Sequence, residues 1–319
     1  MYTKKLLEKN IFLKYKEFLS ITDRELLAMY PNNPTPIITL PGSDVWAKLE
    51  YCSFSNSIKD REVFMEFVMA KKNNFKGIVV ASTGNMGVAL ASICALYQYH
   101  CYVFTPTDTS KVKLKQILDL GANLFKIDGN YDQTLPKAVK FSKKNKLFLA
   151  SLQDCRFDGY KTVSYEIYDH FKKNLPEKII IPLGDGTTYV GIYRGFEDLK
   201  VKGLIKKIPK LIGVQANNCS PIVKAFKEKK SIKSCEQPET IAKAIRIGNP
   251  YDGNESINIA KMCHGDMFSY SDKQILTAYE ALLKKGINSE YASAITYCPV
   301  LFEGINNCLL LITGSGFKN

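Results

Sequence analysis

The sequence predicts an α/β protein of two layers, each built on a mainly parallel sheet covered by helices. From residue 77 onward, short apolar runs rich in β-branched residues alternate with stretches of helical character. Continuous apolar strands separated by helices are typical of parallel sheets buried on both faces. The number of these units divides between two layers near residue 151, and 319 residues suffice for two domains.

The elements follow from local patterns. Residues 1–32 form a helical or irregular lead-in, and Pro34 and Pro36 interrupt any helix there. The expected strands or extended segments are residues 36–41, 45–50, 78–81, 101–104, 124–127, 147–150, 179–181, 211–214 and 308–313. The expected helices are residues 62–71, 86–98, 110–120, 132–144, 159–173, 187–200, 219–229 and 272–285. Residues 231–262 are less regular.

Composition excludes several classes of function. The net charge is +13, but the lysines are spread along the chain as pairs at the ends of expected helices, where cations complement the helix dipole. This distribution does not favour a nucleic-acid partner, and an anionic substrate or cofactor better explains the positive field. No apolar run is long enough to span a membrane and no signal peptide follows Met1, so a cytoplasmic location is expected.

The spacing of cysteines and histidines indicates no metal or redox site. The nine cysteines form no C-x-x-C pair, and several lie in apolar runs, so they are expected to be reduced core residues. The three histidines are far apart and show no H-E-x-x-H spacing. We therefore predict no metal.

The loop Ser82-Thr83-Gly84-Asn85 is the first candidate site. It follows the strand at residues 78–81 and opens a helix, and ligands of open α/β sheets bind at the carboxyl ends of strands. Its hydroxyls, its amide and the free N–H groups of a helix N-terminus suit an anion such as a carboxylate. A plain N-capping turn explains the same residues equally well.

The loop Gly184-Asp185-Gly186-Thr187-Thr188 is the second candidate, again between a strand and a helix. Glycines let backbone N–H groups approach an anion, and the two threonines add hydroxyl donors. Tyr189 stands where a dinucleotide fingerprint needs glycine, and no Gly-Lys-Ser/Thr follows as in a Walker loop. A single phosphate monoester therefore fits best, with a structural turn as the alternative.

Two further positions complete the requirements of pyridoxal phosphate. Lys59 lies between small polar residues ahead of a helix, and Thr313-Gly314-Ser315-Gly316 follows an apolar run near the C-terminus. Pyridoxal phosphate needs a lysine for its aldehyde, a glycine-lined helix terminus for its phosphate, and partners for its ring oxygen and nitrogen. Each position alone has an ordinary structural explanation, and only the combination indicates the cofactor.

These motifs resemble those of the fold-type II pyridoxal-phosphate enzymes, which share the tryptophan synthase β-like fold, and within them the threonine synthases. Lys59 in SNSIKDR matches the family's Schiff-base lysine, and Asn85 in STGN matches the asparagine at the ring oxygen. The run Gly184 to Thr188 occupies the place of the phosphate loop, and Thr313 that of the ring-nitrogen threonine. The segments 15–19, 34–37, 213–216 and 240–250 extend the likeness over nearly the whole chain.

The resemblance implies a pyridoxal-phosphate-dependent carbon–oxygen lyase of amino-acid biosynthesis. A threonine synthase converts O-phosphohomoserine to threonine and phosphate by γ-elimination and β-hydration. Lys59 would then be catalytic, Arg156 would hold the leaving phosphate, and Ser151 would lie nearby. The substrate carboxylate would bind at Ser82, Thr83, Asn85 and Met86.

Departures from the family pattern keep other functions open. Ala150 replaces the family's asparagine, Asp185 replaces an asparagine in the phosphate loop, and Met86 replaces a small residue. A carboxylate beside a phosphate is electrostatically unfavourable unless it pairs elsewhere. The alternatives are a β-eliminating or β-replacing enzyme acting on serine, threonine or cysteine, of the dehydratase or cysteine-synthase kind, and a non-catalytic anion-binding protein.

The resemblance also implies a domain organisation and an assembly. Residues 1–60 and 152–319 would form a larger domain that binds pyridoxal phosphate, and residues 61–151 a smaller α/β domain that carries the STGN loop. The family commonly forms homodimers. A small-molecule amino acid, in this case one that carries a phosphate, would be the substrate.

Overall fold

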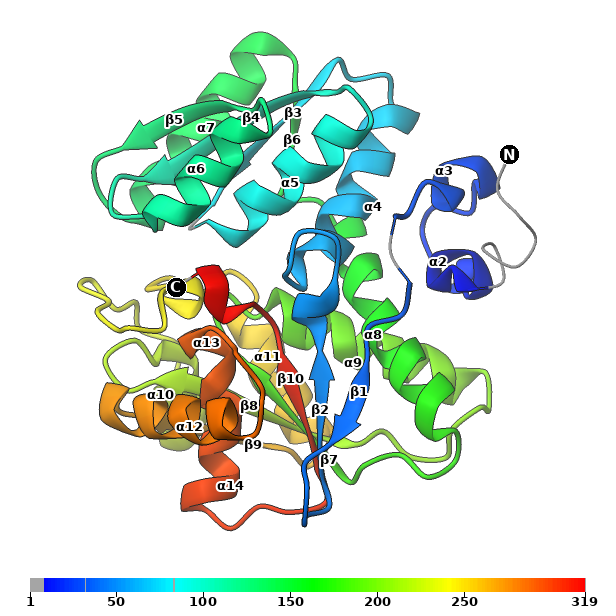
Figure 1. Cartoon of the computed structure of the whole chain (residues 1–319), viewed down its shortest axis with the longest axis vertical. Coiled ribbons are helices and arrows are strands. Elements are labelled where there is room, and N and C mark those ends of the chain that lie inside the picture. The colour runs from blue at the N-terminus through cyan, green and yellow to red at the C-terminus, as the bar shows by residue number, and fades with distance from the viewer. Residues whose placement is uncertain (1–8, 32, 83, 319) are drawn as a thin grey trace. The chain divides into compact units, whose positions relative to one another are not determined.

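The computed structural model describes residues 9–31, 33–82 and 84–318 (Figure 1). The chain divides into two compact units. Unit 1 comprises the described residues up to Pro34 together with Ser53–Thr162 and Lys318, and unit 2 comprises Thr35–Cys52 and Val163–Phe317. Each unit has its own sheet, so the expected α/β fold with two mainly parallel sheets is confirmed.

Unit 1 contains a four-stranded sheet of order β5-β4-β3-β6, in which all neighbouring strands are parallel. Its strands are β3 (Gly77–Ala81), β4 (His100–Pro106), β5 (Asn123–Ile127) and β6 (Phe148–Leu149). Its helices include α2 (Ile11–Lys14), α3 (Arg24–Ala28), α4 (Lys59–Lys72), α5 (Asn85–Leu96), α6 (Lys111–Asp119) and α7 (Tyr131–Asn145). All five residues of β3 are buried, as the apolar sequence of this strand predicts.

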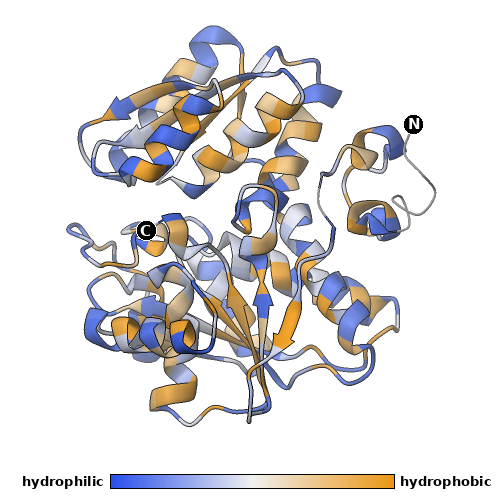
Figure 2. Cartoon of the chain, viewed as in Figure 1, coloured by the Kyte–Doolittle hydropathy of each residue, from blue (hydrophilic) through white to orange (hydrophobic). Residues whose placement is uncertain are grey.

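Unit 2 contains a six-stranded sheet of order β1-β2-β10-β7-β8-β9, parallel except for β1. The strands are β1 (Ile37–Thr39), β2 (Val45–Leu49), β7 (Lys178–Pro182), β8 (Lys210–Ala216), β9 (Asp266–Tyr270) and β10 (Cys308–Ile312). The helices include α9 (Thr187–Val201), α10 (Pro221–Glu228), α11 (Gly253–Met262), α12 (Asp272–Lys284), α13 (Tyr291–Ala294) and α14 (Cys298–Phe302). The strands of this sheet are predominantly hydrophobic (Figure 2), and every residue of β10 is buried.

Several elements of unit 2 lie where the sequence predicts no regular structure, among them the short helices α13 and α14 between residues 285 and 308. Helix α11 falls inside the segment 231–262, and strand β9 follows it. Strand β9 is an edge strand with exposed Asp266 and half-buried Phe268 and Ser269, so it lacks the continuous apolar run of its neighbours. The remaining expected helices and strands are present, with ends that differ by a few residues.

The boundary between the units differs from the expected division at residues 60 and 151. The loop before Lys59 belongs to unit 1, because its backbone is hydrogen-bonded to the first turn of α4. The N-terminal segment belongs there too, since Phe12 packs edge-on against Phe64 of α4 with ring centroids 4.9 Å apart. The second boundary falls inside helix α8 (Cys155–Phe171), after Thr162. No helix in the described part of the chain is long and apolar enough to cross a membrane.

Candidate active site

The loop before Lys59 is folded by its own side chains. The Ser53 hydroxyl donates to the Ser57 carbonyl at 2.7 Å and accepts the Ser57 N–H at 3.1 Å. The Asp60 carboxylate accepts the Ser55 N–H at 2.7 Å. Burial raises the pKa of Asp60, and the hydrogen bonds from Ser55 oppose this rise. These bonds fix the point at which α4 begins, so Lys59 is its first residue.

Lys59 contacts two polar side chains within unit 1. Its Nζ donates to the Tyr160 hydroxyl at 2.7 Å and to Glu62 Oε2 at 2.9 Å. The Tyr160 hydroxyl donates to the same Glu62 oxygen at 2.5 Å. Burial raises the pKa of Tyr160 well above 10, and the Glu62 carboxylate adds to this rise, so the phenol is protonated at neutral pH.

Helix α8 brings Tyr160 to Lys59 through a close contact with α4. A Cβ at Gly159 would lie 2.2 Å from the Arg61 carbonyl oxygen and 2.7 Å from the Glu62 nitrogen, which no side chain tolerates. The Arg61 guanidinium also donates to the Thr162 hydroxyl at 2.8 Å. Glycine at this position therefore allows α8 to lie against the α4 backbone, and this contact places Tyr160 beside Glu62.

The STGN loop follows strand β3 as expected, and Asn85 is the first residue of α5. The Ser82 hydroxyl oxygen accepts the N–H groups of Gly84 and Gly87, both at 2.9 Å. Ser82 therefore caps the helix start, which is the structural role weighed for it in the sequence. Thr83 lies outside the described residues.

Ser151 contacts both Met86 and Glu66 of α4. The Ser151 N–H donates to Glu66 Oε1 at 2.5 Å, and its hydroxyl lies 3.3 Å from the Met86 sulfur. Ser151 has φ +81°, a left-handed conformation that is unfavourable for a residue other than glycine. Burial raises the pKa of Glu66 well above its usual value, and the Glu62 carboxylate raises it further.

Arg156, at the start of α8, is held by its own loop. Its guanidinium donates to the Gln153 carbonyl at 3.0 Å, lies 3.7 Å from the Asp154 carboxylate and stacks over the Phe157 ring at 4.1 Å. Its side chain is only 3% exposed. A buried guanidinium of fixed orientation is suited to bind a phosphate or carboxylate in two-pronged fashion.

The loop Gly184–Thr188 lies in unit 2, at the carboxyl end of β7 and the N-terminus of α9. Gly186 has φ +102°, and a Cβ there would lie 2.5 Å from the Ser256 hydroxyl oxygen, so only glycine fits. The Thr187 hydroxyl lies 2.8 Å from Asp185 and 2.7 Å from Asp252. Asp185 also accepts the N–H of Thr187, the first residue of α9, at 3.2 Å.

Thr313 follows β10, which pairs in parallel with β7. Because the carboxyl ends of parallel strands meet at one edge of a sheet, Thr313 and the loop 184–188 belong to the same edge of unit 2. The Thr313 hydroxyl lies 2.9 Å from the Ser293 hydroxyl, which also accepts the Gly314 N–H at 2.9 Å. Ser293 thus orients Thr313 and fixes the turn that follows it.

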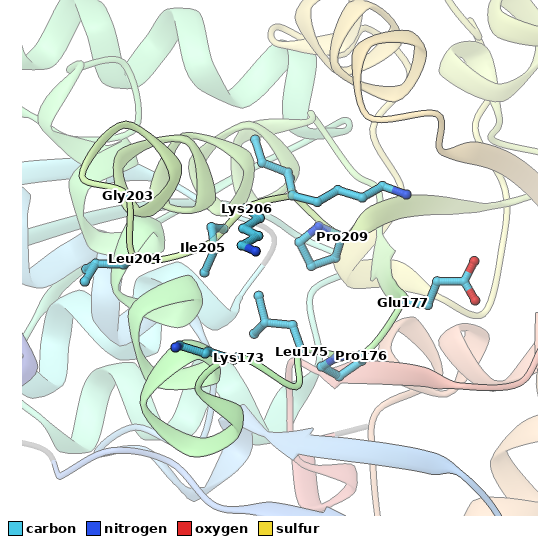
Figure 3. A pocket seen from close by; sticks show the side chains of 11 residues that line it. Lys173, Leu175, Pro176, Glu177, Gly203, Leu204, Ile205, Lys206 and Pro209 are labelled. Atoms are coloured by element: carbon cyan, nitrogen blue, oxygen red, sulfur yellow. The ribbon is translucent and has the colours of Figure 1, made fainter.

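Unit 2 also contains a cavity of about 550 Å³ at the opposite edge of its sheet (Figure 3). Its walls come from Lys173 and residues 175–177 and 203–209, in the segments that precede β7 and β8. These are the amino ends of the strands, whereas ligands of open α/β sheets bind at the carboxyl ends. The cavity is therefore separate from the predicted cofactor loop.

Comparison with known proteins defines the class. The family model described as "Pyridoxal-phosphate dependent enzyme" matches residues 29–310. The chain therefore belongs to this family, and the predicted cofactor, pyridoxal 5'-phosphate, is confirmed.

Among curated relatives the chain is similar to threonine synthases, which supports the predicted lyase class. It is 30% identical to that of Methanocaldococcus jannaschii, covering 96% of this chain and 80% of the relative. It is 32% identical to that of Halalkalibacterium halodurans, covering 98% and 90%. Among solved structures, maize serine racemase matches with a TM-score of 0.78 at 16% identity over 92% of both chains, which establishes the fold alone.

Each unit, taken by itself, carries residue types that fit one part of the cofactor. Unit 1 supplies a lysine at a helix start with polar partners at its Nζ, and unit 2 supplies a glycine-lined helix N-terminus with a threonine at the same sheet edge. The two carboxylates at Thr187 are unfavourable for a phosphate. They are bound to a hydroxyl and a backbone N–H, which offsets part of this repulsion.

The predicted site residues therefore divide between the units. Lys59, Ser82, Asn85, Met86, Ser151 and Arg156 belong to unit 1, and Gly184–Thr188 and Thr313 to unit 2. Four contacting residues were not predicted, namely Glu62, Glu66, Tyr160 and Ser293. Glu62 and Glu66 follow Lys59 at helical spacing and could have been found from the expected helix, whereas nothing in the sequence pairs Tyr160 with Lys59 or Ser293 with Thr313.

Proposed function

We propose that the chain is a threonine synthase, which converts O-phosphohomoserine to threonine and phosphate. The observation that carries this proposal is the similarity to curated threonine synthases over 96–98% of the chain. It is supported by the residue types that the sequence resemblance implies for the site, beginning with Lys59 and Arg156.

Lys59 is proposed to bind the cofactor aldehyde and to move protons during the reaction. Bound pyridoxal phosphate supplies an electron sink for negative charge that develops on the substrate. Lys59 is suited to proton transfer because its side chain is 25% exposed and its Nζ lies within hydrogen-bond distance of Tyr160 and Glu62.

The substrate's two anionic groups are proposed to bind separately. The helix start at Asn85 offers N–H groups to the carboxylate, with Ser82 fixing the turn and Met86 and Ser151 in contact with each other beside it. Thr83 is included in this proposal from its place in the sequence. Arg156 is proposed to bind the leaving phosphate. Its orientation over Phe157 is maintained by the Gln153 carbonyl, so little conformational entropy is lost when the phosphate binds.

The loop of unit 2 is proposed to hold the cofactor phosphate. Gly184 and Gly186 keep the backbone accessible, and the N–H of Thr188 lies in the first turn of α9, where intrahelical partners are lacking. Asp185 and Thr187 shape the turn through their mutual hydrogen bond. Thr313, oriented by Ser293, is proposed to contact the ring nitrogen.

The test is turnover by the purified, cofactor-loaded protein. O-phosphohomoserine should yield phosphate and threonine in equal amounts, and Lys59→Ala should abolish both products. Arg156→Lys keeps the charge but not the planar geometry, so it should weaken turnover of this substrate while leaving cofactor absorbance intact. Absence of both products at full cofactor occupancy would contradict the proposal.

One observation favours a second candidate, β-elimination from unphosphorylated serine or threonine. The Arg156 guanidinium already engages Gln153 and lies near Asp154, and an enzyme without a phosphate to bind would leave it there. The same preparation should then form pyruvate or 2-oxobutyrate from these amino acids. Arg156→Lys would leave that reaction nearly unchanged, which separates the two candidates.

A further inference from the structure

Lys59, Glu62 and Tyr160 form a closed triangle of hydrogen bonds. The three edges are 2.7, 2.9 and 2.5 Å long, and Glu62 Oε2 accepts from both other groups. The Lys59 Nζ also lies 5.4 Å from the centre of the Tyr160 ring. The carboxylate side chain is 3% exposed and that of the lysine 25%, so the pair is far less screened than an ion pair on the surface.

Among the described contacts, Glu62 is a carboxylate hydrogen-bonded to the Lys59 ammonium. Glu66, one turn further along α4, has its pKa raised well above its usual range by burial and by Glu62, which favours its neutral form. Burial likewise raises the pKa of the Cys155 thiol and of the Tyr160 phenol, which keeps both neutral. Arg156 is the other cation that acts on Glu66.

We propose that Glu62 and Tyr160 form a holding site for the Lys59 ammonium, which keeps this lysine protonated whenever it is not bonded to the cofactor. The inference rests on the proposed role of Lys59 and goes beyond it by assigning the groups that control its proton. The Tyr160 hydroxyl donates to Glu62 and accepts from Lys59, so it orients both side chains toward each other.

The proton balance of the site follows from the geometry. Lys59 reacts as a neutral amine, so one proton must first leave Nζ. The Glu62 carboxylate, 2.9 Å away, accepts it, which leaves a neutral amine and a neutral carboxylic acid with no change in total charge. When the lysine is released, the proton returns from Glu62 to Nζ and the ammonium is held again.

The test measures the reactivity of Lys59 in the full-length protein freed of cofactor. Acetic anhydride in trace amount acylates neutral amines, and peptide mass spectrometry gives the rate at each lysine between pH 6 and pH 10. Because an opposite charge within about 4–6 Å shifts a titration by 1–3 units, Glu62→Gln should accelerate Lys59 acylation about tenfold at pH 8. Its pH profile should move down by about one unit, and Tyr160→Phe should give about a threefold acceleration.

Two controls match this design. Lys115 pairs with Asp119 at 2.6 Å on an exposed helix surface, so Asp119→Asn should leave Lys115 acylation nearly unchanged. Glu66→Gln imitates the protonated Glu66 and keeps an oxygen for the Ser151 N–H, so Lys59 acylation should match that of the unmodified chain. Circular dichroism verifies that each variant is folded.

The outcomes separate this inference from the proposed function. Unchanged Lys59 acylation profiles in both folded variants, Glu62→Gln and Tyr160→Phe, would overturn the holding site, even if Lys59→Ala loses the cofactor. If Lys59→Ala retains the cofactor band after gel filtration, the role proposed for Lys59 fails instead, whatever the acylation rates. Acceleration in both variants, with the expected order, supports the holding site.

Discussion

Gly159→Ala tests whether the contact between α8 and α4 positions the partners of Lys59. The added Cβ would lie 2.2 Å from the Arg61 carbonyl oxygen, and because both sides of the contact are helix backbone, no side-chain rotation relieves it. The helices must separate by roughly 1 Å to restore an ordinary contact distance. Such overpacking costs about 1–3 kcal/mol, whereas alanine returns about 1 kcal/mol of helix propensity over glycine.

The net loss should therefore be up to about 2 kcal/mol, with a melting temperature lower by roughly 2–4 °C per kcal/mol lost. Far-ultraviolet circular dichroism is the suitable probe, because the single tryptophan, Trp46, lies in unit 2. Gly253→Ala is the comparison variant, since its Cβ would meet side-chain atoms rather than backbone, namely Ile232 Cδ1 at 2.6 Å, Pro250 Cγ at 3.0 Å and Ile222 Cγ1 at 3.2 Å. If Gly159→Ala is as stable as the unmodified chain and Lys59 keeps its acylation rate, the contact between α8 and α4 does not position the partners of Lys59.

Three further predictions concern single side chains. The pKa of Glu66 is raised in the folded state, so its contribution to the free energy of unfolding is fully present below about pH 4.5 and is lost as pH rises. Glu66→Gln does not titrate, so its stability relative to the unmodified chain should increase by up to about 1.4 kcal/mol per pH unit above pH 4.5. Urea unfolding from pH 5 to 8 measures this difference. Asp185→Asn removes a charge but keeps an acceptor for the Thr187 N–H, so the Kd of pyridoxal phosphate should fall several-fold in a fluorescence titration, and a weaker affinity would contradict this. Ser293→Ala leaves the Gly314 N–H without its acceptor, so thermal unfolding should show a loss of about 1–2 kcal/mol, and no loss would argue against this role for Ser293.

Most of the fold could be predicted because its strands are continuous and apolar. The apolar runs of β3, β7 and β10 are buried, and continuous apolar runs of this length predict strands of a parallel sheet. Strand β9 could not be recognised, because an edge strand keeps polar residues on its exposed side. The boundary inside α8 depends on the contact of Gly159 with another helix, which no local pattern encodes.

The candidate site could be predicted only in part. Lys59, Asn85 and the loop at Gly184 lie at helix starts after short turns, and these positions follow from local spacing. Tyr160 is 101 residues from Lys59 in sequence, and its hydroxyl reaches the lysine only because two helices touch. The sequence allows two roles for Ser82, a ligand contact or a turn that caps a helix. The structure shows its hydroxyl oxygen accepting the N–H groups of Gly84 and Gly87 at the start of α5.

The most direct test of the account is to find which lysine carries the cofactor. The protein is loaded with pyridoxal phosphate, reduced with borohydride and digested, and the labelled peptide is sequenced by mass spectrometry. The account predicts one label on Lys59 and none on Lys59→Ala, together with threonine and phosphate from O-phosphohomoserine before reduction. A stable label on another lysine, with Lys59 unmodified, would contradict it.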